Sequence, residues 1–315
     1  MSHTYGRGLH ELGDGLFAYL QPDGSWGWSN AGLVTDGDHS LLVDTLFDLG
    51  LTETMLGEMR RAAPAAARFD ALVNTHSNGD HWFGNELVPT SRIVATRRCA
   101  EEMLELPPSA FAALMAAAPG LGTTGAFLQE VFGPFRFEGI TAAPPTETFD
   151  AELSLRVGRH EVQLRDLGPA HTGSDTIAYV PTAGVVFTGD LLFVGGHPIM
   201  WAGPSENWLR ALDAILALDV ETIVPGHGPL SGRDDVASLK AYWEHVRTEA
   251  RVRYEAGMPA DAAARDIPLG DFSAWGERER LVVNVIGLYR EFAGAGERPP
   301  TTELLGPMAA FWAGA

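Results

Sequence analysis

Alternating and continuous runs of apolar residues predict two groups of β-strands, each followed by helices. Strands are expected at 15–20, 31–36, 40–46, 69–75 and 91–96, and again at 151–157, 160–167, 176–180, 185–188 and 221–224. Apolar residues at helical spacing predict helices at 51–64, 97–132, 205–218, 234–256 and 274–293. This order favours an α+β sandwich of two sheets with helices on both outer faces.

A dense cluster of polar side chains directly follows the strand predicted at 69–75. His76, Asn78, Asp80 and His81 lie within six residues of one another. Alternating residues of a tight loop can point into one cavity, and imidazole and carboxylate are common ligands of zinc, iron and manganese. The alternative is a polar loop in which Asp80 caps a following helical segment.

Three further polar residues stand at the ends of predicted strands. His171 follows the breaker Gly168-Pro169-Ala170, Asp190 follows Gly189, and His227 lies between Gly226 and Gly228. Glycine permits the backbone turns and close approach that a crowded site needs. Each residue alone is typical of an ordinary loop, but the repeated order of strand, breaker and polar residue indicates a shared metal site.

The ordered set resembles the signature of the metallo-β-lactamase superfamily, H-x-H-x-D-H followed by a lone His, a lone Asp or Cys, and a last His. The resemblance covers about residues 10–235 and implies a four-layer αββα sandwich. It also implies two metal positions. The first would be held by His76, position 78 and His171, and the second by Asp80, His81 and His227, with Asp190 bridging both.

Asn78 departs from the family pattern, which has a histidine at this position. An amide oxygen is a harder and weaker ligand than imidazole, so the first position should hold metal less tightly or prefer a harder ion. We therefore expect one or two divalent metal ions, zinc first, with iron or manganese as alternatives. If Asn78 does not bind metal, its amide N–H would instead donate to a substrate oxygen or to the attacking hydroxide.

The implied chemistry is attack by a metal-activated hydroxide, with Asp80 orienting the nucleophile and handling its proton. Hydrolysis of an ester, lactone or thioester is expected. Asp190 stands where β-lactamases with a cysteine ligand have Cys, which places the chain nearer the glyoxalase II and thioesterase side of the superfamily. Two alternatives are open. One is a non-hydrolytic iron or manganese enzyme, an oxygenase, oxidoreductase, cyclase or decarboxylase, and the other is a non-catalytic binding protein with a degraded site.

Aromatic residues beside the ligands predict a pocket for a bulky apolar or aromatic acyl group, as in bacterial secondary metabolism. Trp82 and Trp201 are candidate substrate-binding residues, and Trp82 has the alternative of a core residue. His197, at the start of a loop near the mouth, is a third candidate substrate-binding residue, interpreted as a solvent-side loop residue rather than an eighth metal ligand. The remaining histidines are interpreted as surface residues: His3, His10, His39, His160 and His245.

Two regions lie outside the minimal pattern. The helical insertion at about 97–139 either caps the site or forms an ordinary hairpin with its apolar face on the core. The helical extension at about 236–315 would pack on the sandwich, line the pocket or form a homodimer interface. Since ligands come from both halves of the chain, a single domain over 1–315 is expected.

The net charge of the chain favours a small-molecule substrate over a nucleic-acid partner. The net charge of −19 repels phosphate backbones, which argues against nucleic acid. The sole cysteine, Cys99, is expected to be a packed core thiol on a helix. The first residues lack the pattern of a secretion signal and no apolar run approaches membrane-spanning length, so the expected location is the cytoplasm without membrane attachment.

Overall fold

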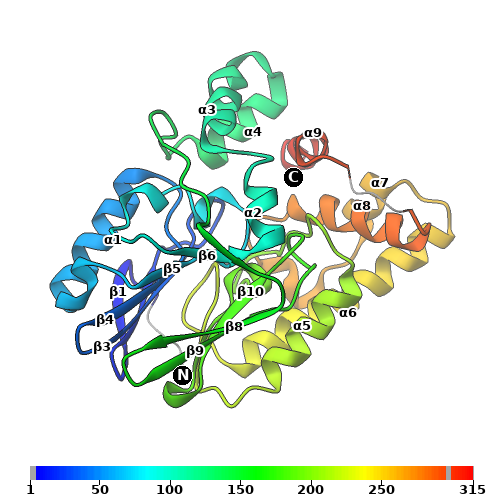
Figure 1. Ribbon diagram of the computed structural model, residues 1–315. Helices are drawn as coiled ribbons and strands as arrows, with labels where there is room; N and C mark the ends of the chain where they lie inside the picture. The colour runs from blue at the N-terminus through cyan, green and yellow to red at the C-terminus, as the bar shows by residue number, and fades with distance from the viewer. Residues whose placement is uncertain (1–4, 296–298, 315) are drawn as a thin grey trace.

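Two β-sheets face each other at the centre of the computed structural model, which describes residues 5–295 and 299–314 (Figure 1). The first sheet contains, in spatial order, Gly8–Gly13 (β1), Leu16–Leu20 (β2), Ala31–Asp36 (β3), His39–Val43 (β4), Ala71–Val73 (β5), Ile93–Thr96 (β6) and Glu147–Phe149 (β7). The second contains Thr222–Val224 (β12), Val185–Phe187 (β11), Thr176–Val180 (β10), His160–Asp166 (β9) and Glu152–Val157 (β8).

The strand directions decide which loops share an edge. The first sheet is antiparallel from β1 to β4 and parallel from β4 to β7. In the second sheet β11 and β12 are parallel, and the other pairs are antiparallel. The loops that follow β4 and β5 therefore lie at one edge of the first sheet, and those that follow β11 and β12 lie at one edge of the second.

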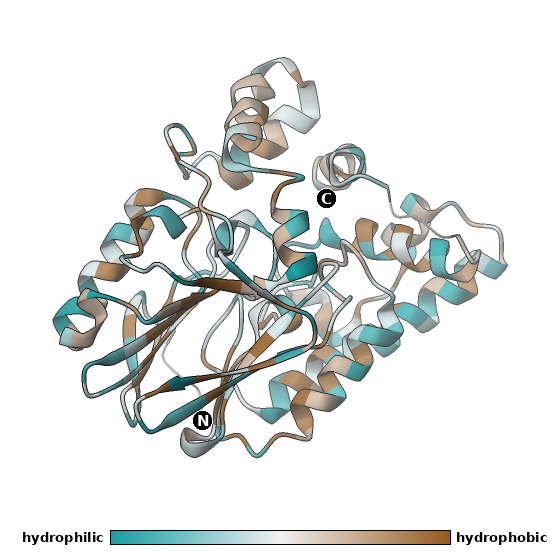
Figure 2. Ribbon diagram, viewed as in Figure 1, coloured by the Kyte–Doolittle hydropathy of each residue, from teal (hydrophilic) through white to brown (hydrophobic). Residues whose placement is uncertain are grey.

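Helices cover the outer faces of both sheets and also stand beside the sandwich. The α-helices of the described residues are Leu49–Ala62 (α1), Arg97–Met103 (α2), Pro108–Ala117 (α3), Gly122–Phe132 (α4), Ser205–Leu216 (α5), Arg233–Glu255 (α6), Ala260–Asp266 (α7), Arg280–Phe292 (α8) and Thr301–Trp312 (α9). Figure 1 shows α1 outside the first sheet, and α5 and α6 outside the second. In Figure 2 the surface helices carry hydrophilic and hydrophobic faces along their length, as expected of helices packed on one side.

Alternation along the strands builds this layered structure. On β3, Val34 belongs to the core between the sheets and Leu33 to the core under α1. On β4, Leu41 and Leu42 divide in the same way. Because successive strand residues point to opposite faces, one run of apolar residues supplies both cores. The predicted αββα sandwich is confirmed.

The structure also corrects several predicted elements. The single helical stretch expected at 97–132 is three separate helices, α2 to α4, and the helix expected from 274 begins at Arg280. The strands β1 and β7 and the helices α7 and α9 were not expected. Within the described residues, no helix combines the length and apolar composition needed to cross a membrane.

The insertion and the end of the chain meet beside the sandwich. Helix α4 packs against α9, and Figure 1 shows α3 and α4 standing next to α9 above the sheets. Phe127 of α4 and Met308 of α9 belong to the same hydrophobic cluster as the residues between α6 and the second sheet. Both interpretations of the insertion hold in part, because its apolar face packs on the body and also lines the cavity described below.

Candidate metal centre

The residues predicted to bind metal gather where strand ends of the two sheets meet. His76 follows β5, His171 follows β9, Asp190 follows β11 and His227 follows β12. A backbone hydrogen bond of 2.8 Å from the amide of Thr176 to the carbonyl of Thr75 ties the start of β10 to the loop after β5. The ends of strands from both sheets therefore converge on one buried place.

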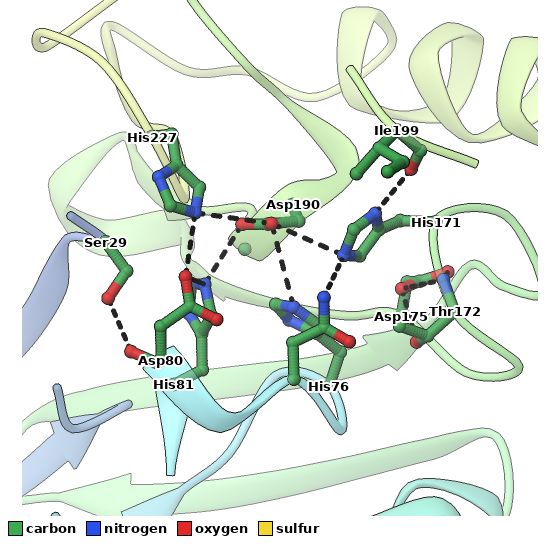
Figure 3. Close-up of polar contacts among 12 residues, drawn as sticks. Ser29, His76, Asp80, His81, His171, Thr172, Asp175, Asp190, Ile199 and His227 are labelled. Atoms are coloured by element: carbon green, nitrogen blue, oxygen red, sulfur yellow. Dashed lines mark hydrogen bonds and ion pairs between the residues drawn. The ribbon is translucent and has the colours of Figure 1, made fainter. Parts of the chain in front are cut away.

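Asp190 lies at the centre of this group (Figure 3). Its Oδ2 is 3.8 Å from Nε2 of His76 and 3.4 Å from Nε2 of both His171 and His227. Its Oδ1 is 3.1 Å from Nε2 of His81. Four imidazole nitrogens thus face one carboxylate, as a ligand bridging two metal ions requires.

Asp80 completes the second set of ligand-type residues. Its Oδ2 lies 3.3 Å from Nε2 of His227 and 3.9 Å from Nε2 of His81. The candidate ligand atoms form two groups that could each hold a metal ion, Asp80 with His81 and His227, and Asp190 with His76 and His171. The structure brings the histidines and carboxylates assigned to metal binding together in two groups, and Asn78 belongs to neither of them.

Each metal-facing histidine is fixed through its other ring nitrogen. The partners of Nδ1 are Thr75 Oγ1 at 3.0 Å for His76, Asp44 Oδ2 at 3.0 Å for His81, Ile199 O at 2.7 Å for His171 and Gly24 O at 3.0 Å for His227. A proton held on Nδ1 by such a partner leaves the Nε2 lone pair free to bind metal. All four imidazoles are therefore oriented as ligands by the chain itself.

Asp44 was missed by the sequence reasoning. It follows β4 directly, and besides His81 its carboxylate accepts hydrogen bonds from the backbone and hydroxyl of Thr75 at 2.8 and 2.7 Å. Its backbone has a φ of 62°, which is uncommon for a residue with a side chain. The signal that could have found it is the same one used for the ligands, a carboxylate at the end of an apolar strand.

Buried polar atoms without partners fit a metal ion at this place. Nε2 of His76, Nε2 of His81 and Oδ1 of Asp190 are buried and form no hydrogen bond of good geometry among the described residues. Such atoms cost free energy unless another group satisfies them. Gly226 leaves room for the carboxylate, since a Cβ there would lie 1.9 Å from Oδ1 of Asp190. The imidazole and carboxylate donors, and the space that Gly226 leaves beside Asp190, suit a divalent cation such as zinc, iron or manganese.

Burial and neighbouring charges shift the histidine pKa values in opposite directions in the two groups, down in the first and up in the second. Burial lowers the pKa of His171 to about 4, although Asp190 acts against it. Burial also lowers the pKa of His227, but the carboxylates of Asp190 and Asp80 outweigh it and raise this pKa to about 9. The pKa of His81 is raised for the same reasons. Without metal, the second group therefore holds protons that a metal ion must displace.

Asn78 lies against the first group rather than in solvent. Its Nδ2 is 2.9 Å from Nε2 of His171. Because Nδ1 of His171 donates to Ile199, Nε2 is the acceptor and the Asn78 amide is the donor. The amide thus occupies the lone pair that a first metal ion would use.

An apolar cavity of about 300 Å³ opens onto these residues. Asn78, Asp80, His171, Asp190 and His227 lie at its inner end. Aromatic and aliphatic side chains from the early loop, the insertion, the loop before α5 and the tail form much of its wall, including Trp26, Phe111, Phe132, Trp201, Leu305 and Met308. Trp201 thus lines the cavity, and its role in substrate binding stays a prediction.

Two other substrate-binding assignments are wrong. Trp82 is 1% exposed, belongs to the core beneath the insertion, and donates from Nε1 to the carbonyl of Ser77 at 3.0 Å. It supports the metal loop, as in the alternative interpretation. His197 is fully buried, away from solvent and from the cavity lining, with Nδ1 3.0 Å from the Tyr242 hydroxyl. Its neighbours in space come from α6 and α8, which the local sequence does not reveal.

The remaining histidines and the cysteine follow their predictions with one exception. His160 is 1% exposed and is held between Thr182 Oγ1 and Asp14 O at 2.9 Å each, so its assignment to the surface is wrong. His39 is exposed, and His10 and His245 are half-buried. His3 lies outside the described residues. Cys99 is a buried core thiol on α2.

The two-sheet sandwich and the histidines and carboxylates at its strand ends place this protein in the class of metallo-hydrolases. A family model described as the Metallo-beta-lactamase superfamily matches residues 24–227, and the chain belongs to this superfamily. A hydroxyacylglutathione hydrolase from Chromohalobacter salexigens is 30% identical over 125 residues, which cover 39% of this chain and 42% of that enzyme. The match thus spans less than half of the relative's length.

Solved structures support the fold. The sec-alkylsulfatase Pisa1 from Pseudomonas sp. is similar with a TM-score of 0.66 and 17% identity, over 94% of this chain and 53% of that chain. A metallo-beta-lactamase from Pontibacter korlensis is similar with a TM-score of 0.52 and 16% identity, over 74% of this chain and 98% of that chain. At these identities the likeness concerns the fold alone.

Proposed function

We propose that this protein is a metal-dependent hydrolase of carboxylic esters, lactones or thioesters that carry a bulky apolar or aromatic acyl group. The observation that carries the proposal is the apolar cavity of about 300 Å³ that ends on Asp80, His171, Asp190 and His227. A concave pocket lined mostly by aromatic and aliphatic side chains, with a small number of polar groups, is typical of small-molecule sites. The partial match to a hydroxyacylglutathione hydrolase also supports acyl hydrolysis.

The chain's own residues have separable tasks in this reaction. Divalent metal ions bound by the two residue groups would supply activated water and polarise the oxygen under attack. Asp80 lines the cavity beside His227, so its carboxylate can orient the attacking water and take its proton. The aromatic wall excludes bulk water and holds the acyl group against this end of the cavity.

Unequal occupancy of the two metal positions is part of the proposal. The group of Asp80, His81 and His227 offers three ligands, all buried or nearly so. In the other group the amide of Asn78 competes for His171. We therefore expect zinc to bind first and more tightly at the second group.

Elemental analysis of the purified protein, with assays on aryl esters, lactones, thioesters and a secondary alkyl sulfate, tests the function. Bound zinc together with acyl hydrolysis is the expected result, and its loss on chelation should abolish turnover. Hydrolysis of the sulfate alone would contradict the acyl assignment. Iron or manganese without any hydrolysis would favour oxygen-dependent chemistry, and absence of metal would favour a binding protein.

A further inference from the structure

One positively charged side chain is built into the wall of the apolar cavity. Arg280, the first residue of α8, is 2% exposed and is the only lysine or arginine lining the cavity among the described residues. Its Nη1 donates to the carbonyl of His197 at 3.0 Å, whereas its Nε is buried with no hydrogen-bond partner in the described chain. A guanidinium has five N–H donors, and burying one unsatisfied costs free energy.

Arg280 lies between the metal centre and the aromatic wall. Its Cζ is 4.2 Å from the ring centroid of Trp26 and 5.4 Å from that of Phe193. Phe193 in turn stacks on the imidazole of His227, with centroids 5.3 Å apart and an interplanar angle of 4°. On the other side, the ring centroids of Trp26 and Trp201 lie 6.4 Å apart. The guanidinium is therefore separated from His227 of the metal centre by the ring of Phe193.

Neighbouring carboxylates do not satisfy the free donor of Arg280. Glu277 Oε2 lies 4.0 Å from Nη1, too far for a hydrogen bond. Glu279 accepts from Nε1 of Trp26 at 2.6 Å and so fixes the ring on which the guanidinium stacks. Glu277 thus forms a long ion pair with the cation, and neither glutamate engages Nε.

We infer that Arg280 binds a carboxylate of the substrate, an inference that rests on the proposed acyl hydrolysis. The substrate would be an ester or thioester with an apolar body against Trp26 and Trp201 and a carboxylate directed to Arg280. A planar guanidinium suits a carboxylate because it offers directed, charge-assisted donors, and here it is buried in the cavity wall. Arg280 lies beyond residues 24–227, so this specificity belongs to the C-terminal extension.

The test compares two matched substrates in the zinc-loaded protein. One is the nitrophenyl ester of phenylglutaric acid, which keeps a free carboxylate, and the other is its methyl-capped counterpart. Arg280→Met should raise KM for the free acid by about 10- to 100-fold, the range expected for a lost charge-assisted hydrogen bond, and leave KM for the capped ester unchanged. The exposed Arg278→Met is the control, since it removes the same charge two positions away.

If Arg280→Met does not fold, Arg280→Lys keeps the charge without the planar fork and should still raise KM for the free acid alone. An equal loss on both substrates, or no loss on either, would overturn the role of Arg280. If the native protein hydrolyses neither ester, the acyl-hydrolase proposal fails. In that case phenylbutyrate should still raise the Tm of native protein more than that of Arg280→Met, with phenylbutanol raising both equally, and equal shifts by phenylbutyrate would overturn the carboxylate site.

Discussion

Asn78 is the residue at which this chain departs from the signature of its superfamily, and its contact gives the departure a physical meaning. The amide donates to Nε2 of His171, whose opposite nitrogen is held by Ile199. A metal ion at the first position must displace this hydrogen bond before it can use His171. The substitution therefore weakens the first position in two ways, by removing an imidazole and by blocking another.

Restoring the histidine should fill the first position. In Asn78→His we expect zinc content to rise by about one equivalent, because a two-metal site then has its full ligand set. Elemental analysis after dialysis against zinc-buffered solution measures the change. Gln129→His, which adds an imidazole at an exposed position on α4, should leave zinc content unaltered. An unchanged content in Asn78→His would mean that position 78 does not limit binding.

Zinc affinity should depend on pH in a direction set by the second group. The pKa of His227 is raised to about 9, and that of His81 is also raised, so below pH 9 zinc must displace bound protons. Affinity is then expected to increase with pH up to about 9. Competition with a chromophoric chelator between pH 6 and about 9 checks this direction. An affinity that is constant over this interval would contradict the protonated state of the second group.

Among the secondary-structure elements, those that could be predicted are the ones whose patterns are local. Short apolar runs that end at a polar residue or a chain breaker identified β5, β11 and β12 and with them the ligand positions. The strand β7 has only three residues and is formed by pairing with β6, so its neighbours in space rather than its own pattern define it. Helix α9 contains Pro307, which breaks the local signal, yet α9 packs on α4.

The insertion should govern substrate size without affecting the metal. Phe132 on α4 lines the cavity and makes edge contacts with Trp26, Phe47 and Phe111. Phe132→Ala should lower kcat/KM for bulky aryl esters by about 10-fold or more, as expected when a hydrophobic contact of this size is lost. Metal content should stay the same.

Leu104→Ala provides the control for Phe132→Ala, since Leu104 is on the same insertion and 64% exposed. Its kinetics on aryl esters should match those of the native protein. If Phe132→Ala lost metal as readily as activity, the insertion would be a structural support of the metal centre rather than a wall of the substrate cavity. Glu102 of α2 is the group through which such support would act, since it accepts hydrogen bonds from Ser77 Oγ and the Gly173 amide at 3.1 Å each.

The whole molecule places the site at the junction of two sheets, and this explains why sequence reasoning found the ligands but not all of their surroundings. Ligand types and strand ends are visible in the chain, whereas contacts across the sandwich are not. Trp82 and His197 are close to ligands in sequence, yet both side chains point into cores. Arg280, far from the ligands in sequence, lines the cavity. Proximity along the chain is a poor guide once several elements meet at one edge.

Asn30 shows how the junction is held. It lies just before β3 of the first sheet, and its Nδ2 donates to the carbonyls of Pro225 and Gly228 at 2.9 Å each, on both sides of His227. Its Oδ1 accepts from the amide of Gln21 at 3.2 Å. A single buried amide therefore joins the first sheet to the loop that presents a ligand from the second.

Removing this amide should loosen the junction and lower the metal affinity together. Asn30→Ala leaves two buried carbonyls without their donor, which should lower the free energy of unfolding by about 1–3 kcal/mol. Zinc affinity should fall in the same variant, because the loop carrying His227 loses its anchor. Urea unfolding of zinc-loaded and zinc-free protein separates the two effects, with the exposed Gln129→Ala on α4 as a matched amide truncation. Lower stability with unaltered zinc affinity would show that the loop is held in place without Asn30, and that the two sheets position His227 through their packing alone.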